Sequence, residues 1–218
     1  MSFDAVLDSA AGIAYLAVFD GGQKRFASAT PMRGREAAKL PVWVEEELGK
    51  HGIALADVGR WTVGAGPGSF TGLRLAAALV AGWCYGKKGS CRAVPGVLGM
   101  AAAAGIAPGG RIGCLYDGRN REIICCMVSA DASGRLSLDG EPQILNAEAA
   151  AKFLNDAPGL GLAAFSAELE AVRRIVPAAQ ITAVDAPALA ALEAADIPFD
   201  DDVTRLVYIR PAVYTEKN

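Results

Sequence analysis

The sequence GAGPGSFTG occupies residues 64–72 and places four glycines and one proline among nine positions. It follows Arg60–Val63, which is typical of a strand, and it precedes Leu73–Val80, which is typical of a helix. Glycine-rich turns at the start of a helix often bind phosphate, because the first backbone N–H groups of the helix are free. The stretch therefore predicts a strand–loop–helix unit and raises the question of what its loop does.

The loop lacks the residues of three well-known catalytic or nucleotide-binding loops. A Walker A loop needs a lysine after its last glycine, where this chain has Leu73. A dinucleotide-binding loop needs glycine at the sixth position, which here is Ser69. A nucleophile elbow needs glycine two residues before and after its serine, but Ser69 has Pro67 and Thr71 there. The sequence therefore favours a structural loop.

The rest of the chain offers little to activate a nucleophile or to bind a transition metal. Its single histidine, His51, lies in the helix-ending sequence Lys50–Gly52, where a cation suits the last carbonyl groups. One histidine and scattered cysteines predict no transition-metal site. The acidic run at residues 200–202 is interpreted as a solvated loop, although carboxylates can bind a hard cation.

The remaining role for the loop is structural. Ser69 or Thr71 can cap the following helix, and the glycines permit close approach. The helix itself has an unusually small-sided surface, made of Ala76, Ala77, Ala78, Ala81 and Gly82. Small residues cover too much of its circumference for one buried stripe, which favours contact with a partner protein.

Composition sets broad limits on the protein class. The chain has 218 residues, is 52% hydrophobic and carries a formal charge of −3, which is globular and argues against a free-standing nucleic-acid binder. No apolar run is long enough to span a bilayer, and the N-terminus has an acid where a secretion signal has a base. The five cysteines show no CxxC spacing and are interpreted as small buried hydrophobes. We therefore expect a cytoplasmic protein with no membrane partner.

The order of elements predicts a duplication. Strands are expected at 5–8, 14–19, 24–30 and 60–63, with helices at 34–50, where Pro41 sets a kink or a later start, and at 73–85. The second half is expected to contain strands at 111–116, 122–129, 135–138, 160–165 and 181–184, with helices at 147–155 and 168–176. Two such units predict an α/β fold of two tandem ribonuclease-H-like subdomains with mixed sheets flanked by helices. The subdomains are assigned to residues 1–108 and 109–218, with residues 91–108 as the boundary region.

The two units share one local feature. Asp8 ends the first strand of the first unit, and Asp117 ends the first strand of the second. In folds of this kind the first hairpin of each half can grip the phosphates of a nucleotide. A lone acid at a strand end is, however, more often a turn former that binds nearby backbone amides.

Gly66–Arg74 (GPGSFTGLR) closely resembles the signature of the TsaB family, also called YeaZ. The neighbouring segments agree in order: an early Asp8–Ser9, the Leu40–Pro41 helix, and Arg92–Val97 (RAVPGV) at a strand-to-helix join. The hairpin around Leu115–Ile123 and the closing Tyr208–Pro211 (YIRP) are also similar. The chain departs from the family pattern at Arg35–Glu36, where a histidine and a serine are common. It also departs at Ala10–Gly12, which replaces a polar turn.

The resemblance implies an actin-like, sugar-kinase-like fold and a role in forming N6-threonylcarbamoyladenosine at position 37 of tRNAs that read codons beginning with A. It implies a subunit without catalytic residues, metal or cofactor of its own. This subunit would dimerise with a TsaD-type catalytic subunit that holds the metal, work with a TsaE-type ATPase, and meet ATP, magnesium and tRNA only through the complex. Whether the isolated chain forms a homodimer stays open.

The residues assigned by this interpretation form two groups. Vestigial phosphate contacts are expected at Asp8, Ser9, Gly66, Gly68, Ser69, Thr71 and Asp117. The partner interface is expected at Leu40, Val44, Leu73, Arg74, Ala77, Ala78 and Ala81. Direct contact with tRNA is considered only as a minor contribution from Arg33, Arg35, Arg119 and Arg121.

The rival hypothesis is an enzyme of the same fold. An ATP-dependent kinase or carbamoyl transferase would use Asp8 and Asp117 around Mg²⁺ and phosphate. A peptidase is disfavoured, because no nucleophile has a base and no metal has its ligands. Binding and hydrolysis of Mg-ATP by the isolated chain would distinguish the enzyme from the scaffold.

Overall fold

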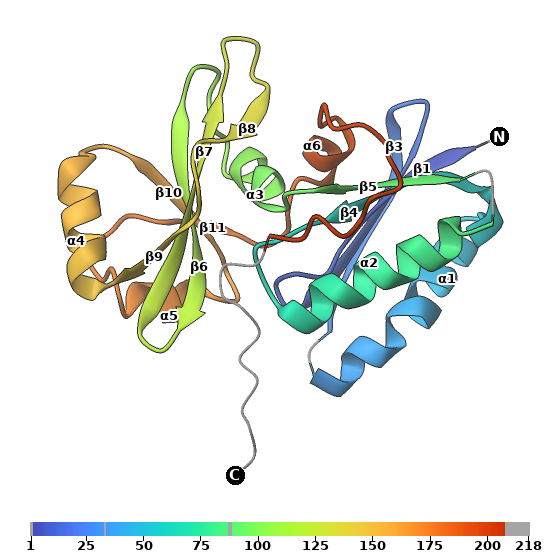
Figure 1. Ribbon diagram of the computed structural model, residues 1–218, viewed down its shortest axis with the longest axis horizontal. Coiled ribbons are helices and arrows are strands. Elements are labelled where there is room, and N and C mark those ends of the chain that lie inside the picture. The colour runs from blue at the N-terminus through green and yellow to red at the C-terminus, as the bar shows by residue number, and fades with distance from the viewer. Residues whose placement is uncertain (1, 33, 87–88, 208–218) are drawn as a thin grey trace.

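The computed structural model describes residues 2–32, 34–86 and 89–207, and in it two mixed sheets lie side by side (Figure 1). The first sheet has the strand order β3-β2-β1-β4-β5, with bounds β1 Phe3–Asp8, β2 Ile13–Asp20, β3 Gln23–Pro31, β4 Val58–Gly64 and β5 Ser90–Val94. Strands β1, β2 and β3 form an antiparallel meander, whereas β4 and β5 run parallel to β1. This arrangement brings the carboxyl ends of β1, β4 and β5 to one edge.

The second sheet repeats the same plan. Its order is β11-β10-β6-β7-β8, with bounds β6 Arg111–Arg119, β7 Glu122–Ala130, β8 Leu136–Leu138, β10 Gly161–Phe165 and β11 Thr182–Val184. Strand β9 (Gln143–Asn146) also pairs with β7. Because β6 is antiparallel to β7 and parallel to β10, it occupies the place that β1 has in the first sheet. The predicted duplication, and with it the fold class, is confirmed.

The helices cover the sheets in a pattern that their apolar residues explain. Helix α1 (Leu40–Lys50) and helix α2 (Phe70–Cys84) pack on one face of the first sheet, where Val44 and Val80 join one hydrophobic cluster. Helix α3 (Val97–Ala103) lies between the two sheets (Figure 1). It belongs to a second cluster that contains residues of both halves, such as Phe19 and Phe165. The two halves therefore share a core.

The smaller elements complete the chain. Two 3₁₀ helices span Gly34–Lys39 and Leu55–Asp57, and short α-helices span Ala147–Asp156 (α4), Leu169–Arg173 (α5) and Leu189–Glu193 (α6). The helix predicted for residues 34–50 is thus a 3₁₀ turn followed by α1, and Pro41 lies in the first turn of α1, where its missing N–H costs nothing. Within the described residues, no helix is long and apolar enough to cross a membrane.

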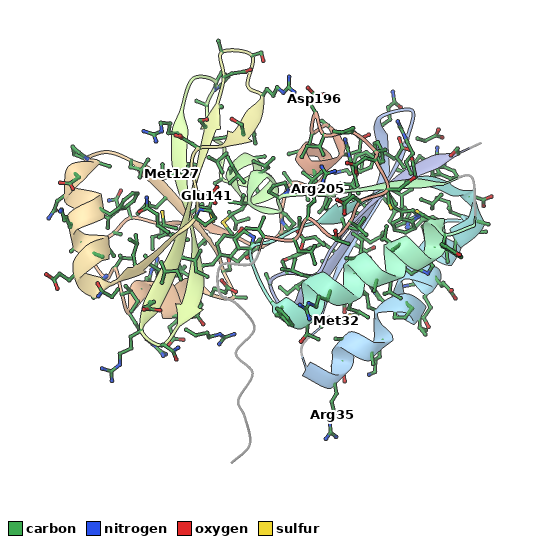
Figure 2. The ribbon with its side chains drawn as sticks, in the orientation of Figure 1. Met32, Arg35, Met127, Glu141, Asp196 and Arg205 are labelled. Atoms are coloured by element: carbon green, nitrogen blue, oxygen red, sulfur yellow. The ribbon has the colours of Figure 1, made fainter. Side chains whose placement is uncertain are left out.

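After β11 the chain returns to the first sheet. Helix α6 packs against α3, β1 and β2, and the buried guanidinium of Arg92 on β5 fixes the segment that follows. It donates to the carbonyl oxygens of Ala195 and Ile197 at 2.7 Å, and it also bonds Leu192 and Glu193. The segment carrying Arg205 crosses in front of the first sheet (Figure 2). Residues after Asp185 therefore help to build the first half, and the predicted boundary at 108 stays a prediction.

The cysteines behave as small hydrophobes, as predicted. Four of the five are buried, and none of the five forms a disulfide. Cys125 and Cys126 point to opposite sides of β7, since they belong to different hydrophobic clusters. Burial raises the pKa of both thiols to about 12, so neither is a nucleophile at neutral pH.

Candidate functional site

The candidate site lies where the carboxyl ends of β1, β4 and β5 meet. In open α/β sheets, ligands bind outside this edge of the parallel strands. Three connections leave it: the turn after Asp8, the glycine loop after Gly64, and the Pro95–Gly96 join after β5. The Gly66–Pro67 peptide bond in the glycine loop is cis.

Hydrogen bonds close the glycine loop onto the other two connections. The Ser69 N–H donates to the Ala10 carbonyl oxygen at 2.6 Å, and the Ser9 hydroxyl donates to the Gly72 carbonyl oxygen at 2.8 Å. On the other side, the Gly96 N–H donates to the Gly66 carbonyl oxygen at 2.8 Å. The three connections thus form one bonded unit.

The glycines permit this contact because a side chain would not fit. A Cβ atom at Gly72 would lie 2.1 Å from the Ser9 carbonyl oxygen, and one at Gly68 would lie 2.5 Å from the Ala10 carbonyl oxygen. Both neighbours are backbone atoms, which cannot move aside as a flexible side chain can. The prediction that these glycines permit a close approach of backbone is confirmed, and the structure identifies the approaching segment as the turn after β1.

Asp8 is enclosed by the same connections. Its Oδ1 accepts a 2.8 Å hydrogen bond from the Ala10 N–H, while its Oδ2 lies so near Gly64 and Gly96 that a Cβ at either would be within 2.7 Å. Burial raises the pKa of this carboxyl group, and the bond from Ala10 only partly opposes that effect. Asp8 is therefore a turn former that holds the first hairpin, the more common of the two roles weighed for it.

The start of α2 is capped as the sequence predicts. Ser69 is the N-cap residue, and its Oγ accepts from the Gly72 N–H at 3.3 Å. Thr71 is exposed in the first turn. The structure thus brings six of the seven predicted phosphate contacts to one place, namely Asp8, Ser9, Gly66, Gly68, Ser69 and Thr71.

Asp117, the seventh, lies in the other sheet near the end of β6. Its Oδ1 accepts from the Arg119 N–H at 2.9 Å, and its own N–H donates to the Glu168 Oε2 at 3.1 Å. In the second hairpin, the Glu168 carboxylate thus accepts a hydrogen bond from the backbone N–H of Asp117. In the first hairpin, the Asp8 carboxyl group accepts one from the backbone N–H of Ala10. Both hairpins bind carboxylates of the chain itself.

Each hairpin carries one buried tyrosine, Tyr15 on β2 and Tyr116 on β6. The Tyr15 hydroxyl donates to the Asp185 carbonyl oxygen at 2.6 Å and links β2 to the end of β11. Burial, then the negative charges of Asp8 and Asp185, raise the pKa of Tyr15 to about 12. Burial also raises the pKa of Tyr116, whose ring packs edge-on against Phe165. Both phenols are therefore uncharged at neutral pH.

The predicted partner interface divides into buried and exposed residues. Four of its seven members lie in the core of the chain itself, namely Leu40, Val44, Leu73 and Ala77. Assigning them to a surface is therefore wrong, because the helices use them to pack on the first sheet. Arg74 and Ala78 are exposed and Ala81 is half-buried, so they stay available for the predicted contact.

Other predicted surface residues are placed as follows. Arg35, at the start of the 3₁₀ turn before α1, points away from the body of the molecule (Figure 2). Arg119 and Arg121 are exposed at the tip of the β6–β7 hairpin. Arg33 and the closing Tyr208–Pro211 lie outside the described residues. Within the described part, no three His, Cys, Asp or Glu side chains come together as metal ligands.

Two residues of the site were not predicted from the sequence. Gly96 and Gly64 both lie against the Asp8 carboxyl group, although the two glycines are 32 positions apart in the chain. Glu168 reaches the Asp117 N–H from the start of α5. No local pattern marks Glu168, since only the folded chain brings it near the hairpin. For Gly96, its place directly after a strand and a proline was an available signal.

Comparison with known proteins adds the following findings. Residues 35–151 match the model of the family described as TsaD: tRNA N6-adenosine threonylcarbamoyltransferase. Among solved structures, the chain is similar to a Pseudomonas aeruginosa protein described as similar to peptidase YeaZ, with 24% identity and a TM-score of 0.67. It is also similar to YeaZ from Pseudomonas aeruginosa, with 22% identity and a TM-score of 0.67. Each alignment covers 88% of this chain and 89% of the other.

A more distant likeness extends over a similar length. The ethanolamine utilization protein EutJ from Carboxydothermus hydrogenoformans is 11% identical with a TM-score of 0.50, and 88% of each chain is covered. No curated protein matches the chain significantly. These structural likenesses establish the fold, and the family match extends over more than half of the sequence.

Proposed function

The chain belongs to the TsaD family of tRNA N6-adenosine threonylcarbamoyltransferases, and from this premise we propose that it is a non-catalytic partner of a TsaD-type catalytic subunit. The resemblance to the TsaB or YeaZ family, first seen in GPGSFTGLR, is confirmed. The family places the chain in tRNA modification. Its part there, we infer, is to dock to the subunit that carries the chemistry, with a TsaE-type ATPase acting on the pair.

The closed glycine loop is the observation that carries this proposal. A phosphate-binding turn works by offering free backbone N–H groups to an anion. Here the Ala10 N–H bonds the Asp8 carboxylate, and the Ser9 hydroxyl bonds the Gly72 carbonyl oxygen. Gly68 and Gly72 lie directly against the backbone of the turn. A phosphate at this place would displace backbone and meet a buried carboxyl group, so the turn supports docking better than phosphate chemistry.

The histidine content also supports a non-catalytic role. The family resemblance assigns a metal-binding histidine pair to the catalytic subunit. This chain has one histidine in its whole sequence, so it cannot supply such a pair alone. A working complex would take its metal ligands from the partner.

The outer side of α2 supplies a surface for that partner. Arg74, Ala78 and Gly82 follow one another at four-residue spacing and are exposed, so they lie on one side of the helix. A Cβ at Gly82 would meet no atom within 4 Å, so the chain's own packing does not require glycine there. Small residues let a second backbone come close. Tyr85, which caps α2, is 88% exposed and adds an apolar edge to this face.

A charged substitution on this face tests the proposal. We expect Ala78→Glu to weaken association with a TsaD-type subunit by at least about tenfold, equivalent to about 1.4 kcal/mol, because a carboxylate would be buried against the partner. The matched control is Ala151→Glu on α4, which changes another exposed helical alanine. Affinity is measured by calorimetry, and circular dichroism checks that both variants fold.

Two results would contradict the proposal. Equal association of both variants would remove α2 from the interface. Hydrolysis of Mg-ATP by the isolated chain that disappears in Asp8→Asn would favour the rival enzyme. Sedimentation of each variant alone shows whether the same face also supports a homodimer.

A further inference from the structure

A pocket of about 360 Å³ opens at the far side of the first sheet from the glycine loop. Gln23, Lys24 and Arg25 line it from the β2–β3 hairpin, and His51 and Ile53 line it from the segment after α1. The hairpin and the end of α1 lie at the outer edge of the first half (Figure 1). The hairpin turns through Gly21 and Gly22, which have φ of +57° and +79° as a two-residue type I′ turn requires.

An irregularity in β3 brings two cations to the same pocket. Neighbouring residues of a regular strand point to opposite faces. The register of β2 and β3 shifts between Val18 and Phe19. Phe26 is paired with Val18 and Lys24 with Phe19, which leaves Arg25 as the extra residue of a bulge. Bulges re-aim side chains in this way. As a result, Lys24 and Arg25 both line the pocket although they are adjacent in sequence.

The end of α1 holds the opposite wall in a fixed position. The Ile53 N–H donates to the Leu48 carbonyl oxygen at 3.1 Å and the Gly52 N–H to that of Gly49 at 3.0 Å, which is a Schellman motif. The His51 ring stacks on Phe26 with centroids 3.9 Å apart and planes 8° apart. The imidazole therefore has little freedom, and its nitrogens are held at the pocket wall.

The charge balance of this pocket is positive. Lys24 has no salt bridge among the described residues, and the Arg25 guanidinium reaches Asp20 only at 4.0 Å. Glu47, on the last turns of α1, is already bound by Lys50 at 2.6 Å and by Ser28 at 2.6 Å. The Asp20 carboxylate near Arg25 offsets one of the two positive charges, and the carbonyl end of the helix adds about half a negative charge, so a small positive charge is left over. In a chain of net charge −3 this is a local basic site.

We propose that this pocket binds a backbone phosphate of RNA, so that the chain contacts the tRNA on which the complex acts. The inference rests on the proposed function for the identity of the RNA. Lys24 and Arg25 supply the charge, and the Gln23 amide and the His51 ring supply hydrogen-bonding groups at the same place. This site differs from the arginines that the sequence suggested for tRNA contact.

The lining favours a nucleic acid over a protein partner. Its single apolar residue, Ile53, is only 5% exposed, so the exposed surface of the pocket is more polar than apolar. Protein interfaces need an apolar centre, whereas contacts with nucleic acids consist largely of charge and hydrogen bonds to phosphate. The long exposed side chains of a hairpin tip also suit an extended phosphate backbone better than an enclosed small ligand.

The test compares two double variants with equal loss of charge. One is Lys24→Gln with Arg25→Gln, and the control is Lys152→Gln with Arg173→Gln, two exposed cations of the second half. Binding of an unmodified tRNA transcript is measured by fluorescence anisotropy from 50 to 300 mM salt, with the full chain both alone and in complex with a TsaD-type subunit. Each lost phosphate contact lowers the slope of log affinity against log salt by about 0.9. We therefore expect the pocket variant, which loses one phosphate contact, to lose about 0.9 unit of slope and about tenfold in affinity at 0.1 M salt, and the control to lose less than threefold.

Three outcomes would overturn the inference. Equal losses in both variants would mean a diffuse charge effect. An unchanged slope in the pocket variant would remove the pocket from RNA contact. Competition by polyglutamate as strong as by RNA at equal charge would assign the pocket to an acidic protein surface. Association with the TsaD-type subunit is measured in parallel and is expected to be unchanged, so that failure of this site is distinct from failure of the proposed function.

Discussion

The two ends of α2 use glycine for opposite reasons. At the first turn, Gly72 is pressed against the Ser9 backbone, with 2.1 Å between a Cβ there and the carbonyl oxygen. Near the last turn, Gly82 is exposed and a Cβ there meets nothing within 4 Å. The first glycine is required by the fold of this chain, whereas the second is not. This difference separates the part of the helix that builds the site from the part that we propose meets a partner.

The largest effect is expected at the closed end. Gly72→Ala should lower the free energy of unfolding by roughly 3 kcal/mol, because the new methyl group collides with backbone that cannot move aside. Alanine has a better helix propensity than glycine, which by itself would stabilise the variant. A net loss of stability would therefore come from the steric effect. Urea unfolding followed by circular dichroism measures it. A stability equal to that of the unchanged chain would mean that the first hairpin yields to the loop.

A smaller effect is expected from the buried carboxyl group of the same end. The folded chain holds a proton on Asp8 at pH values where the unfolded chain, with an ordinary pKa near 3.8, has lost it. Stability from this residue should therefore fall as the pH rises from about 4 through the raised pKa of the folded state. Asp8→Asn should remove this part of the pH dependence. The difference in unfolding free energy between the two proteins is measured from pH 3.5 to 8, and a difference that stays constant would contradict the assignment.

The smallest effect is expected at the open end, and it sharpens the contrast. Gly82→Ala should raise the free energy of unfolding by about 0.5–1 kcal/mol, since alanine loses less backbone entropy than glycine and meets no neighbour here. The same urea titration measures it, so the two glycines of one helix are predicted to shift stability in opposite directions. Loss of stability in Gly82→Ala would show that this face is packed in the isolated chain.

Most strands and the longer helices could be predicted from the sequence, including the three-residue strands β8 and β11. Strand β9 and helix α6 were missed, because four and five residues are too few to show a period. The interpretation of α2 was right about its small residues and wrong about some of their positions. Ala77 is buried, and its small side chain lets the helix lie close to the first sheet. Ala78 is exposed, and we propose that its small side chain lets a partner approach. A one-dimensional pattern does not distinguish these two causes.

The sequence by itself determined the strand–loop–helix unit, the duplicated order of elements and the absence of a second histidine. These follow from local rules: apolar runs, glycine-rich turns and residue identity. Only the tertiary structure decided that Ser9 and Ala10 fill the glycine loop, that Glu168 reaches the second hairpin, and that a bulge turns Lys24 and Arg25 toward His51. Those contacts join residues tens of positions apart, and their geometry depends on how the sheets and helices pack around them.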